Sequence, residues 1–278
     1  MTATTGATHG LLLQLAAPLQ SWGERSRFTH KRDTAAAPTR SGLIGLICSA
    51  LGRRRDESIE DLEPFAFTVR IDRPGTQVRD LHTVGGGLPR HLTVATAEGK
   101  RRTGETGTLL SHRYYLQDAV FTVAVTAADQ ALVQECADAL RCPVWPPYLG
   151  RRSCPPSGPM VLLGAVPDPL HHLLELPLAR TAPASQRRTP QATVRVDFTS
   201  DEPLSQLLTD TAVDRAEQIV GEAQDDPVSF APLDRRYRTR PVHRTTLQLP
   251  ALLCGGYGVD YLTALHTYLD HDNRTEAS

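Results

Sequence analysis

The stretch Phe65-Ala-Phe-Thr-Val-Arg-Ile-Asp72 decides the fold of this chain. Its odd-numbered residues are Phe, Phe, Val and Ile, and its even-numbered residues are smaller or polar. Alternation with a period of two is typical of a β-strand that buries one face. The stretch Ala119–Val125 alternates in the same way and predicts a second strand. We therefore expect the core to be built on a β-sheet.

Further strands and two helices are predicted on either side of these stretches. Apolar residues recur at spacings of three, four, seven and eight from Thr39 or Ser41 to Leu51, which predicts a helix. Gly52 is a common type of residue just after a helix end. A second helix is predicted over Asp129–Leu140. Short strands are predicted over residues 11–15, 78–84 and 160–163.

The order strand, helix, strand, insertion, strand, helix, strand predicts an α+β fold. It is the order of the ferredoxin-like (RRM/RAMP-like) βαββαβ arrangement, in which an antiparallel sheet carries two helices on one face. We expect this domain to span residues 10–165, with an insertion at about 85–110. Three glycines open the insertion, and Lys100, Arg101 and Arg102 lie near its tip. We expect a hairpin whose basic tip contacts nucleic-acid phosphates, although charged residues at such tips are often only solvated.

The rest of the chain, residues 166–278, shows weaker patterns. Strands are predicted over residues 172–178, 193–198 and 245–249. Residues 199–241 are expected to form polar loops with one short helix. We therefore expect a smaller β-rich region after the first domain.

The distribution of charge is more informative than its sum. The 278 residues include 30 Lys and Arg and 31 Asp and Glu, which argues against a free-standing basic protein that binds nucleic acid. Only two of the 30 basic residues are lysines, and arginine favours planar, bidentate contacts to phosphate. Arginine enrichment is also what a GC-rich genome produces. Basic residues concentrate in 25–55, 100–102, 151–152 and 235–244, whereas 197–234 holds ten acidic residues, so one face could bind a polyanion.

Composition also bears on location and cofactors. No apolar run reaches the roughly 18 residues that span a bilayer, so we expect no membrane contact. The first ten residues carry no Lys or Arg, which does not fit a secretion signal. The five cysteines are widely spaced and form no C-x-x-C pair. We expect reduced thiols in a cytoplasmic protein, with no metal and no cofactor.

Two turns carry the first candidate binding residues. Trp22 lies in the turn 18–23, where it could stack on an unpaired base while Gln20 and Ser21 offer hydrogen bonds. The alternative is that Trp22 closes the core, because tryptophan is usually well buried. At the start of the first helix, Arg40 and Ser41 could hold an anion, since a helix N-terminus has free N–H groups. Ordinary capping is the alternative there.

Further basic residues extend this set. Arg25, Arg27, Lys31 and Arg32 lie in the loop between the two turns, so they could share one ligand with them. Arg151 and Arg152 lie in a Pro-rich loop and could bind RNA or an acidic protein surface equally well.

The sequence carries no motif of a hydrolase, a metalloprotease or a nucleotide-binding enzyme. Metal-free RNA cleavage needs a base for the 2′-OH, an acid for the leaving oxygen and a cation. Cations are plentiful, but the histidines are scattered over separate predicted elements, and His82 and His112 are the residues to test. We therefore expect a binding protein and no catalytic residues. A metal-independent endoribonuclease and a scaffold whose arginines bind acidic proteins are the alternatives.

Five ordered segments resemble the CasD family, the Cas-five subunits of the type I-E CRISPR surveillance complex Cascade. The segments are P-L-Q-S-W-G (18–23), P-T-R-S-G-L-I-G-L (38–46), R-D-L-H-T-V (79–84), R-Y-Y-L-Q-D-A-V-F (113–121) and Y-L-G-R-R-S-C-P-P-S (148–157). The resemblance is close over about 10–165 and loose beyond. Of His82 and His112, His82 is the one that lies inside such a segment, and we count it among the candidate RNA-binding residues.

The resemblance implies a fold and a set of partners. It implies a RAMP domain with a projecting thumb hairpin that caps the repeat-derived 5′ handle of the crRNA. The implied partners are the crRNA, the backbone subunit and the large subunit that reads the PAM, with target DNA reached indirectly. Because Cas-five proteins of type I-C systems cut precursor RNA, the resemblance also keeps the endoribonuclease alternative open.

Overall fold

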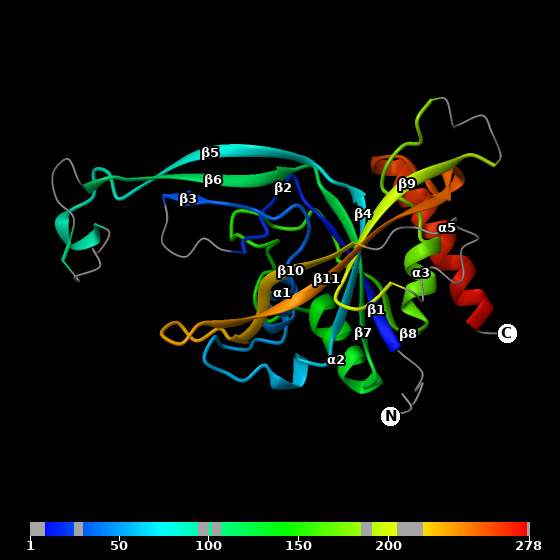
Figure 1. Cartoon of the computed structure of the whole chain (residues 1–278), viewed down its shortest axis with the longest axis horizontal. Coiled ribbons are helices and arrows are strands. Elements are labelled where there is room, and N and C mark those ends of the chain that lie inside the picture. The colour runs from blue at the N-terminus through cyan, green and yellow to red at the C-terminus, as the bar shows by residue number, and fades with distance from the viewer. Residues whose placement is uncertain are drawn as a thin grey trace.

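The computed structural model describes residues 9–24, 30–93, 100–101, 107–184, 191–204 and 219–276, and two β-sheets organise them (Figure 1). The central sheet has seven strands in the order β10-β11-β9-β4-β7-β1-β8, and all neighbours are antiparallel. These strands are β1 (His9–Ala16), β4 (Ala66–Arg73), β7 (Val120–Ala127), β8 (Val161–Pro167), β9 (Thr193–Ser200), β10 (Ile219–Ser229) and β11 (Arg236–Pro250). The chain is therefore a mixed α+β protein.

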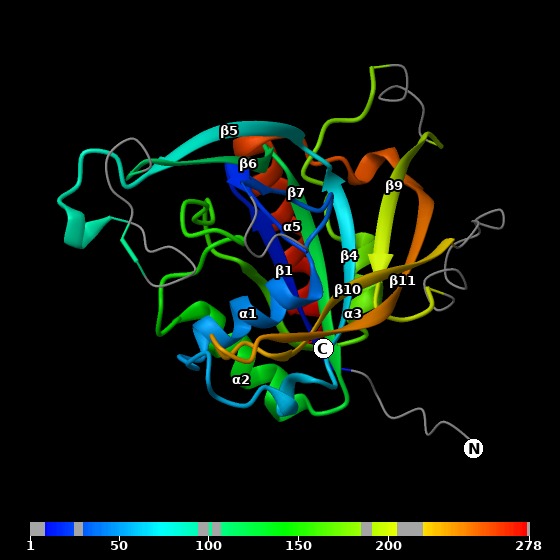
Figure 2. The ribbon, with the colours of Figure 1, turned by 60° about the vertical axis from the view of Figure 1, so that its left-hand side comes forward.

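Helices cover both faces of the central sheet. On one face lie α1 (Arg40–Ala50) and α2 (Gln130–Arg141), and on the other lie α3 (Pro169–Glu175) and α5 (Gly258–Glu276) (Figures 1 and 2). Short 3₁₀ turns are η1 (Glu60–Leu62), η2 (Arg90–Leu92) and η4 (Ala251–Leu253). No helix in these described ranges has the length and apolar character needed to cross a bilayer.

Each face of the sheet has its own core because β1 is apolar on both sides. Leu11, Leu13 and Leu15 pack into the core under α1 and α2. Leu12 packs into the second core, with residues of α3, α5, β9 and β11. The strands of the C-terminal region thus continue the sheet of the N-terminal region.

The smaller sheet forms an arm that projects from the body (Figure 1). We call β5 (Thr76–Val84), β6 (Leu109–Gln117) and the residues between them the arm. Two short strands, β2 (Leu19–Gln20) and β3 (Lys31–Arg32), pair with β6 on the side away from β5.

Both strands of the arm continue directly into the central sheet. β4 leads into β5 through Pro74 and Gly75, and β6 leads into β7 through Asp118 and Ala119. Gly75 and Asp118 adopt positive φ angles of +70° and +58°. We call these four residues the neck, and the left-handed backbone of Gly75 and Asp118 sets the course of the chain from one sheet to the other.

Some sequence predictions for the C-terminal region are wrong. The strand predicted over 172–178 is replaced by α3, because Asp168 caps a helix there by accepting a hydrogen bond from the His171 N–H and Pro169 opens its first turn. The loops predicted over 199–241 contain β10 and the beginning of β11. β10 was not predicted as a strand because it carries acidic side chains, which pair with arginines.

A buried ion pair joins the sheet to α3. Arg70 and Asp72 are both fully buried, and Nε of Arg70 donates to Oδ1 of Asp72 at 2.7 Å. The same guanidinium donates to the carbonyls of Leu173, Leu176 and Pro177, at and just after the end of α3. Cationic groups are stabilising near a helix C-terminus, so this arginine orients α3 on the sheet.

We expect Asp72→Ala to lower the free energy of unfolding by about 3–5 kcal/mol, because it leaves Arg70 buried without its counter-charge. Urea unfolding followed by circular dichroism measures the change. Asp270→Ala is the control, since the ion pair that Asp270 makes within the described residues is with the exposed His266 and should matter little. Equal effects of the two substitutions would contradict the role assigned to the buried pair.

Candidate nucleic-acid interface

The turn after β1 belongs to the core. Trp22 is 1% exposed, and its indole N–H donates to Oε1 of Gln20 at 3.1 Å. Nε2 of Gln20 donates to the carbonyls of Leu15 and Ala119. The ring lies so close to Gly42 that a Cβ there would stand 2.8 Å from it. The prediction that Trp22 stacks on a base beside Gln20 is therefore wrong, and the alternative of a core tryptophan is correct.

Ser21 has an internal partner too. Its hydroxyl donates to the carbonyl of Tyr114 on β6, and its backbone N–H donates to the carbonyl of Leu149. It is 3% exposed, so the expected hydrogen bond to RNA is corrected to a bond within the chain. Gly150 has a φ of +87°, and a Cβ there would overlap the Ser21 carbonyl oxygen at 1.6 Å. This contact fixes the loop that carries Arg151.

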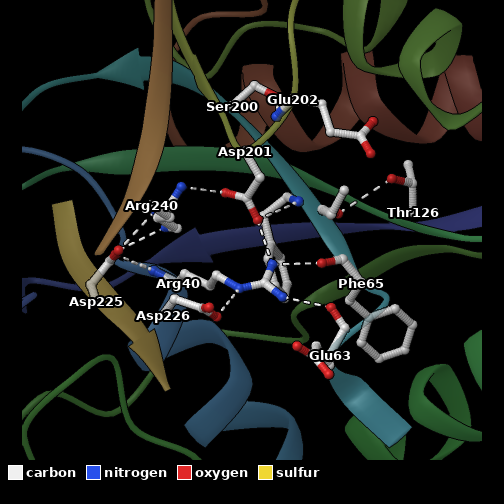
Figure 3. A network of polar contacts seen from close by, with 12 residues as sticks. Arg40, Glu63, Phe65, Thr126, Ser200, Asp201, Glu202, Asp225, Asp226 and Arg240 are labelled. Carbon is white, nitrogen blue, oxygen red and sulfur yellow. Dashed lines mark hydrogen bonds and ion pairs between the residues drawn. The ribbon is translucent and has the colours of Figure 1, made fainter. Parts of the chain in front are cut away.

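Arg40 lies at the centre of a network of charges and is 7% exposed (Figure 3). Its guanidinium donates to the carboxylates of Asp201 (2.5 Å) and Asp226 (2.9 Å) and to the carbonyls of Glu63 (2.8 Å) and Phe65 (2.5 Å). Arg240 closes the network, since it donates to Asp201 and Asp225 at 2.7 Å each. The prediction that Arg40 binds a phosphate is therefore wrong, because its charge is already neutralised.

The start of α1 does bind an anion, but the anion is Asp225. The backbone N–H of Arg40 donates to Oδ2 of Asp225 at 2.7 Å, and the Thr39 hydroxyl accepts from the Gly42 N–H. The acidic segment of the sequence is thus the partner of the basic segment around α1. Ser41, beside these groups, is half-buried.

Two exposed positive charges lie where β3 pairs with β6. In β3, Lys31 and Arg32 are exposed and pair in register with His112 and Arg113 of β6. Successive side chains of a strand point to opposite faces, so Lys31 and Arg32 lie on opposite faces of the arm. Nζ of Lys31 lies 5.2 Å from the centre of the Tyr114 ring.

Three arginines, which we call the arginine cluster, gather on one of these faces: Arg32, Arg113 and Arg151. Arg151 donates to the carbonyls of Arg32 (3.1 Å), Asp33 (3.2 Å) and Tyr114 (3.0 Å). Burial lowers the pKa of Arg32, and the positive charges of Arg113 and Arg151 lower it further. Arg113 was not among the predicted site residues, although it opens the segment 113–121, because only its register with Arg32 brings it here.

The remaining predicted residues are spread along the chain. Lys100 and Arg101 are exposed, and Arg101 donates to the carbonyl of Thr93. Arg152 is exposed beside Arg151. Arg25, Arg27 and Arg102 lie outside the described residues. The face of the arm that carries Lys31 also exposes Leu81 (59%) and Leu110 (53%).

The two candidate histidines lie on opposite faces of the arm. His82 pairs in register with Ser111, whereas His112 pairs with Leu81. Nδ1 of His82 lies 3.7 Å from a carboxylate oxygen of Asp80. Among the residues with described positions, no three His, Cys, Asp or Glu side chains are arranged to hold a metal ion.

Comparison with known proteins gives concordant matches. The model of the family described as CRISPR-associated protein (Cas_Cas5) matches residues 10–243. The chain is 39% identical over 171 residues to "CRISPR system Cascade subunit CasD" of Escherichia coli (strain K12), which covers 55% of this chain and 69% of that protein.

Two solved structures are similar. A chain of a "CRISPR RNA-guided surveillance complex" is 43% identical, with a TM-score of 0.79 over 94% of this chain and 99% of that chain. A "Crystal structure of Cas protein" is 28% identical, with a TM-score of 0.55 over 90% of this chain and 98% of that chain.

We expect Arg40→Gln to destabilise the fold by about 3–5 kcal/mol, because it leaves buried carboxylates without their counter-charge. Thermal unfolding of the variant measures this. Arg236→Gln is the matched control, since the ion pair of Arg236 in the described part of the chain is with Asp234, where both side chains are 61% exposed. A variant of Arg40 with the stability of the wild type would show that the network does not hold the fold.

Proposed function

Because the chain belongs to the Cas5 family of CRISPR-associated proteins, as a CasD-like subunit of a Cascade surveillance complex, we propose that it caps the 5′ handle of the crRNA. The observation that carries this proposal is the arm, with exposed basic residues where β3 pairs with β6. A positive surface beside a projecting ribbon is suited to hold a nucleic-acid strand by its phosphates.

The proposal includes a ferredoxin-like domain with a thumb. Strands β4, β7, β1 and β8 are neighbours in that order, and α1 and α2 provide the two connections between strands that the arrangement requires. The arm is inserted between β4 and β7, which is the place expected for the thumb.

We assign protein partners to the apolar part of the arm. The exposed Leu81 and Leu110 lie on one face, where contact with another subunit would remove them from water. The backbone subunit and the large subunit that reads the PAM are the proposed neighbours, and target DNA is reached through them. The place of action is the cytoplasm.

Removing the end of the arm tests the assignment of the arm as the thumb. Val84 and Leu109 pair in register, so an Asn-Gly turn can replace residues 85–108. We expect a variant that unfolds at the temperature of the wild type but no longer co-purifies with the other subunits and a small RNA that begins with a repeat fragment. Assembly of the variant at the wild-type level would contradict the thumb assignment. Aggregation would mean that the removed segment belongs to the core.

We further propose that the chain is not a nuclease. Cleavage without a metal needs a base and an acid on either side of one phosphate. His82 and His112 lie on opposite faces of the arm, and Asp80 provides a sufficient partner for His82.

Incubation of the purified chain with its own repeat RNA and EDTA tests this. We expect no discrete product at neutral pH. A single cleavage position that is lost in His82→Ala or His112→Ala would establish the endoribonuclease alternative. Decay that survives both substitutions would identify a contaminating nuclease.

A further inference from the structure

The arginine cluster lacks the carboxylate ion pairs that three other arginines of the fold make. Arg40, Arg70 and Arg240 each pair with a carboxylate. Within the described part of the chain, no ion pair joins Arg32, Arg113 or Arg151 to a carboxylate. The acid nearest in register to Arg113 is Asp80, which instead lies within ion-pair distance of His82.

The position of the cluster is fixed by the fold. The guanidinium of Arg151 stacks 4.6 Å above the Tyr115 ring and bonds to three backbone carbonyls. Arg32 and Arg113 are held side by side by the parallel pairing of β3 with β6. Like charges in directly opposed positions of a sheet repel each other, and on its other side Arg113 lies in register with the carboxylate of Asp80.

The hydrogen bonds of the described residues leave donors available for a ligand. Arg151 directs both of its terminal nitrogens to carbonyls, and Nε of Arg113 donates to the Ser111 hydroxyl at 3.4 Å. The terminal nitrogens of Arg113 and the exposed guanidinium of Arg32 have no such bond within the described residues. The guanidinium groups of Arg32 and Arg113 can donate to the two non-bridging oxygens of a phosphodiester, and the guanidinium of Arg151 adds a third positive charge beside them.

We propose that Arg32, Arg113 and Arg151 form one site for a single backbone phosphate of the RNA. The proposal rests on the proposed function. It assigns the three arginines to one phosphodiester of the RNA backbone, which they bind independently of the neighbouring base. We favour an RNA phosphate over an acidic protein segment for two reasons. The site is small and its donors are planar guanidinium groups, and it lies beside the β5–β6 ribbon, along which an RNA strand can run.

Binding of the full-length chain to two RNAs measures the role of the site. One RNA carries the repeat-derived 5′ fragment of the crRNA, and the other is a scrambled RNA of the same length. We expect Arg113→Gln to weaken both by about tenfold, since it removes a charged hydrogen bond. The slope of the logarithm of the binding constant against the logarithm of the salt concentration should become shallower by about one unit. Arg141→Gln on α2 is the control, because it changes net charge equally and should alter neither quantity.

Thermal unfolding separates binding from a structural role. Because the variant relieves repulsion, its midpoint without RNA should equal or exceed that of the wild type, whereas a structural arginine would lower it. If Arg113→Gln does not fold, Arg32→Gln provides the same test at an exposed side chain.

A phosphate-by-phosphate substitution identifies the linkage. RNAs in which one linkage is an uncharged methylphosphonate should bind the wild type about tenfold more weakly at one position only. At that position the loss should disappear in Arg113→Gln, because the two changes remove the same contact. Additive losses at every position would overturn the proposal.

The remaining outcomes distinguish this site from the function as a whole. Failure of the wild type to bind either RNA would overturn the proposed function itself. Wild-type affinity in both variants would overturn only the site. Variants that bind RNA normally but no longer join the other subunits would show that the cluster binds an acidic protein surface instead.

Discussion

The pairing of one buried arginine with carboxylates unites parts of the chain that lie far apart in sequence. Arg40 begins α1, and the acids that neutralise it come from the end of β9 and from β10, up to 186 residues away. Arg240 of β11 completes the network, so the helix and the last two strands of the sheet hold one another. Each of these charges is costly to bury alone, and the arrangement is stable only when all of them are present together. This mutual requirement makes the C-terminal region a part of the same sheet as the N-terminal one.

Regular periodicity allowed the elements of the N-terminal region to be predicted from the sequence. β4, β7, α1 and α2 show the alternation or the helical spacing that burial of one face imposes, and their bounds agree with the predictions within a few residues. β10 shows no such pattern because Asp225 and Asp226 occupy positions that face arginines. A single sequence gives no sign that an acid and an arginine so far apart will meet. The segment of α3 was predicted as a strand for a different reason. Its few apolar residues fit the period of a strand as well as that of a helix.

The chemistry of a single residue did not show whether it serves the fold or a ligand. Trp22 and Arg40 are the residues whose chemistry most resembles RNA binding, and both are buried with internal partners. Their polar or charged groups fit equally well inside a protein, and only the three-dimensional surroundings separate the two uses. Lys31, Arg32 and Arg151 were placed in basic segments and do lie beside the arm, whereas Arg113 emerged only from the register of β3 with β6. Arg40 and Arg240 are neutralised by buried carboxylates, whereas Arg32 and Arg113 have no ion pair within the described residues.

The neck has a mechanical consequence. Because β5 and β6 are continuations of β4 and β7, the arm is joined to the central sheet through two covalent connections of two residues each. A Cβ on Gly75 would stand 2.6 Å from the Gln117 carbonyl, so the two connections also touch each other. A ribbon clamped in this way behaves as a cantilever: a load at its far end becomes a torque on the strands at the centre of the molecule. The angle at which the arm leaves the body is therefore set by the backbone torsions of these few residues.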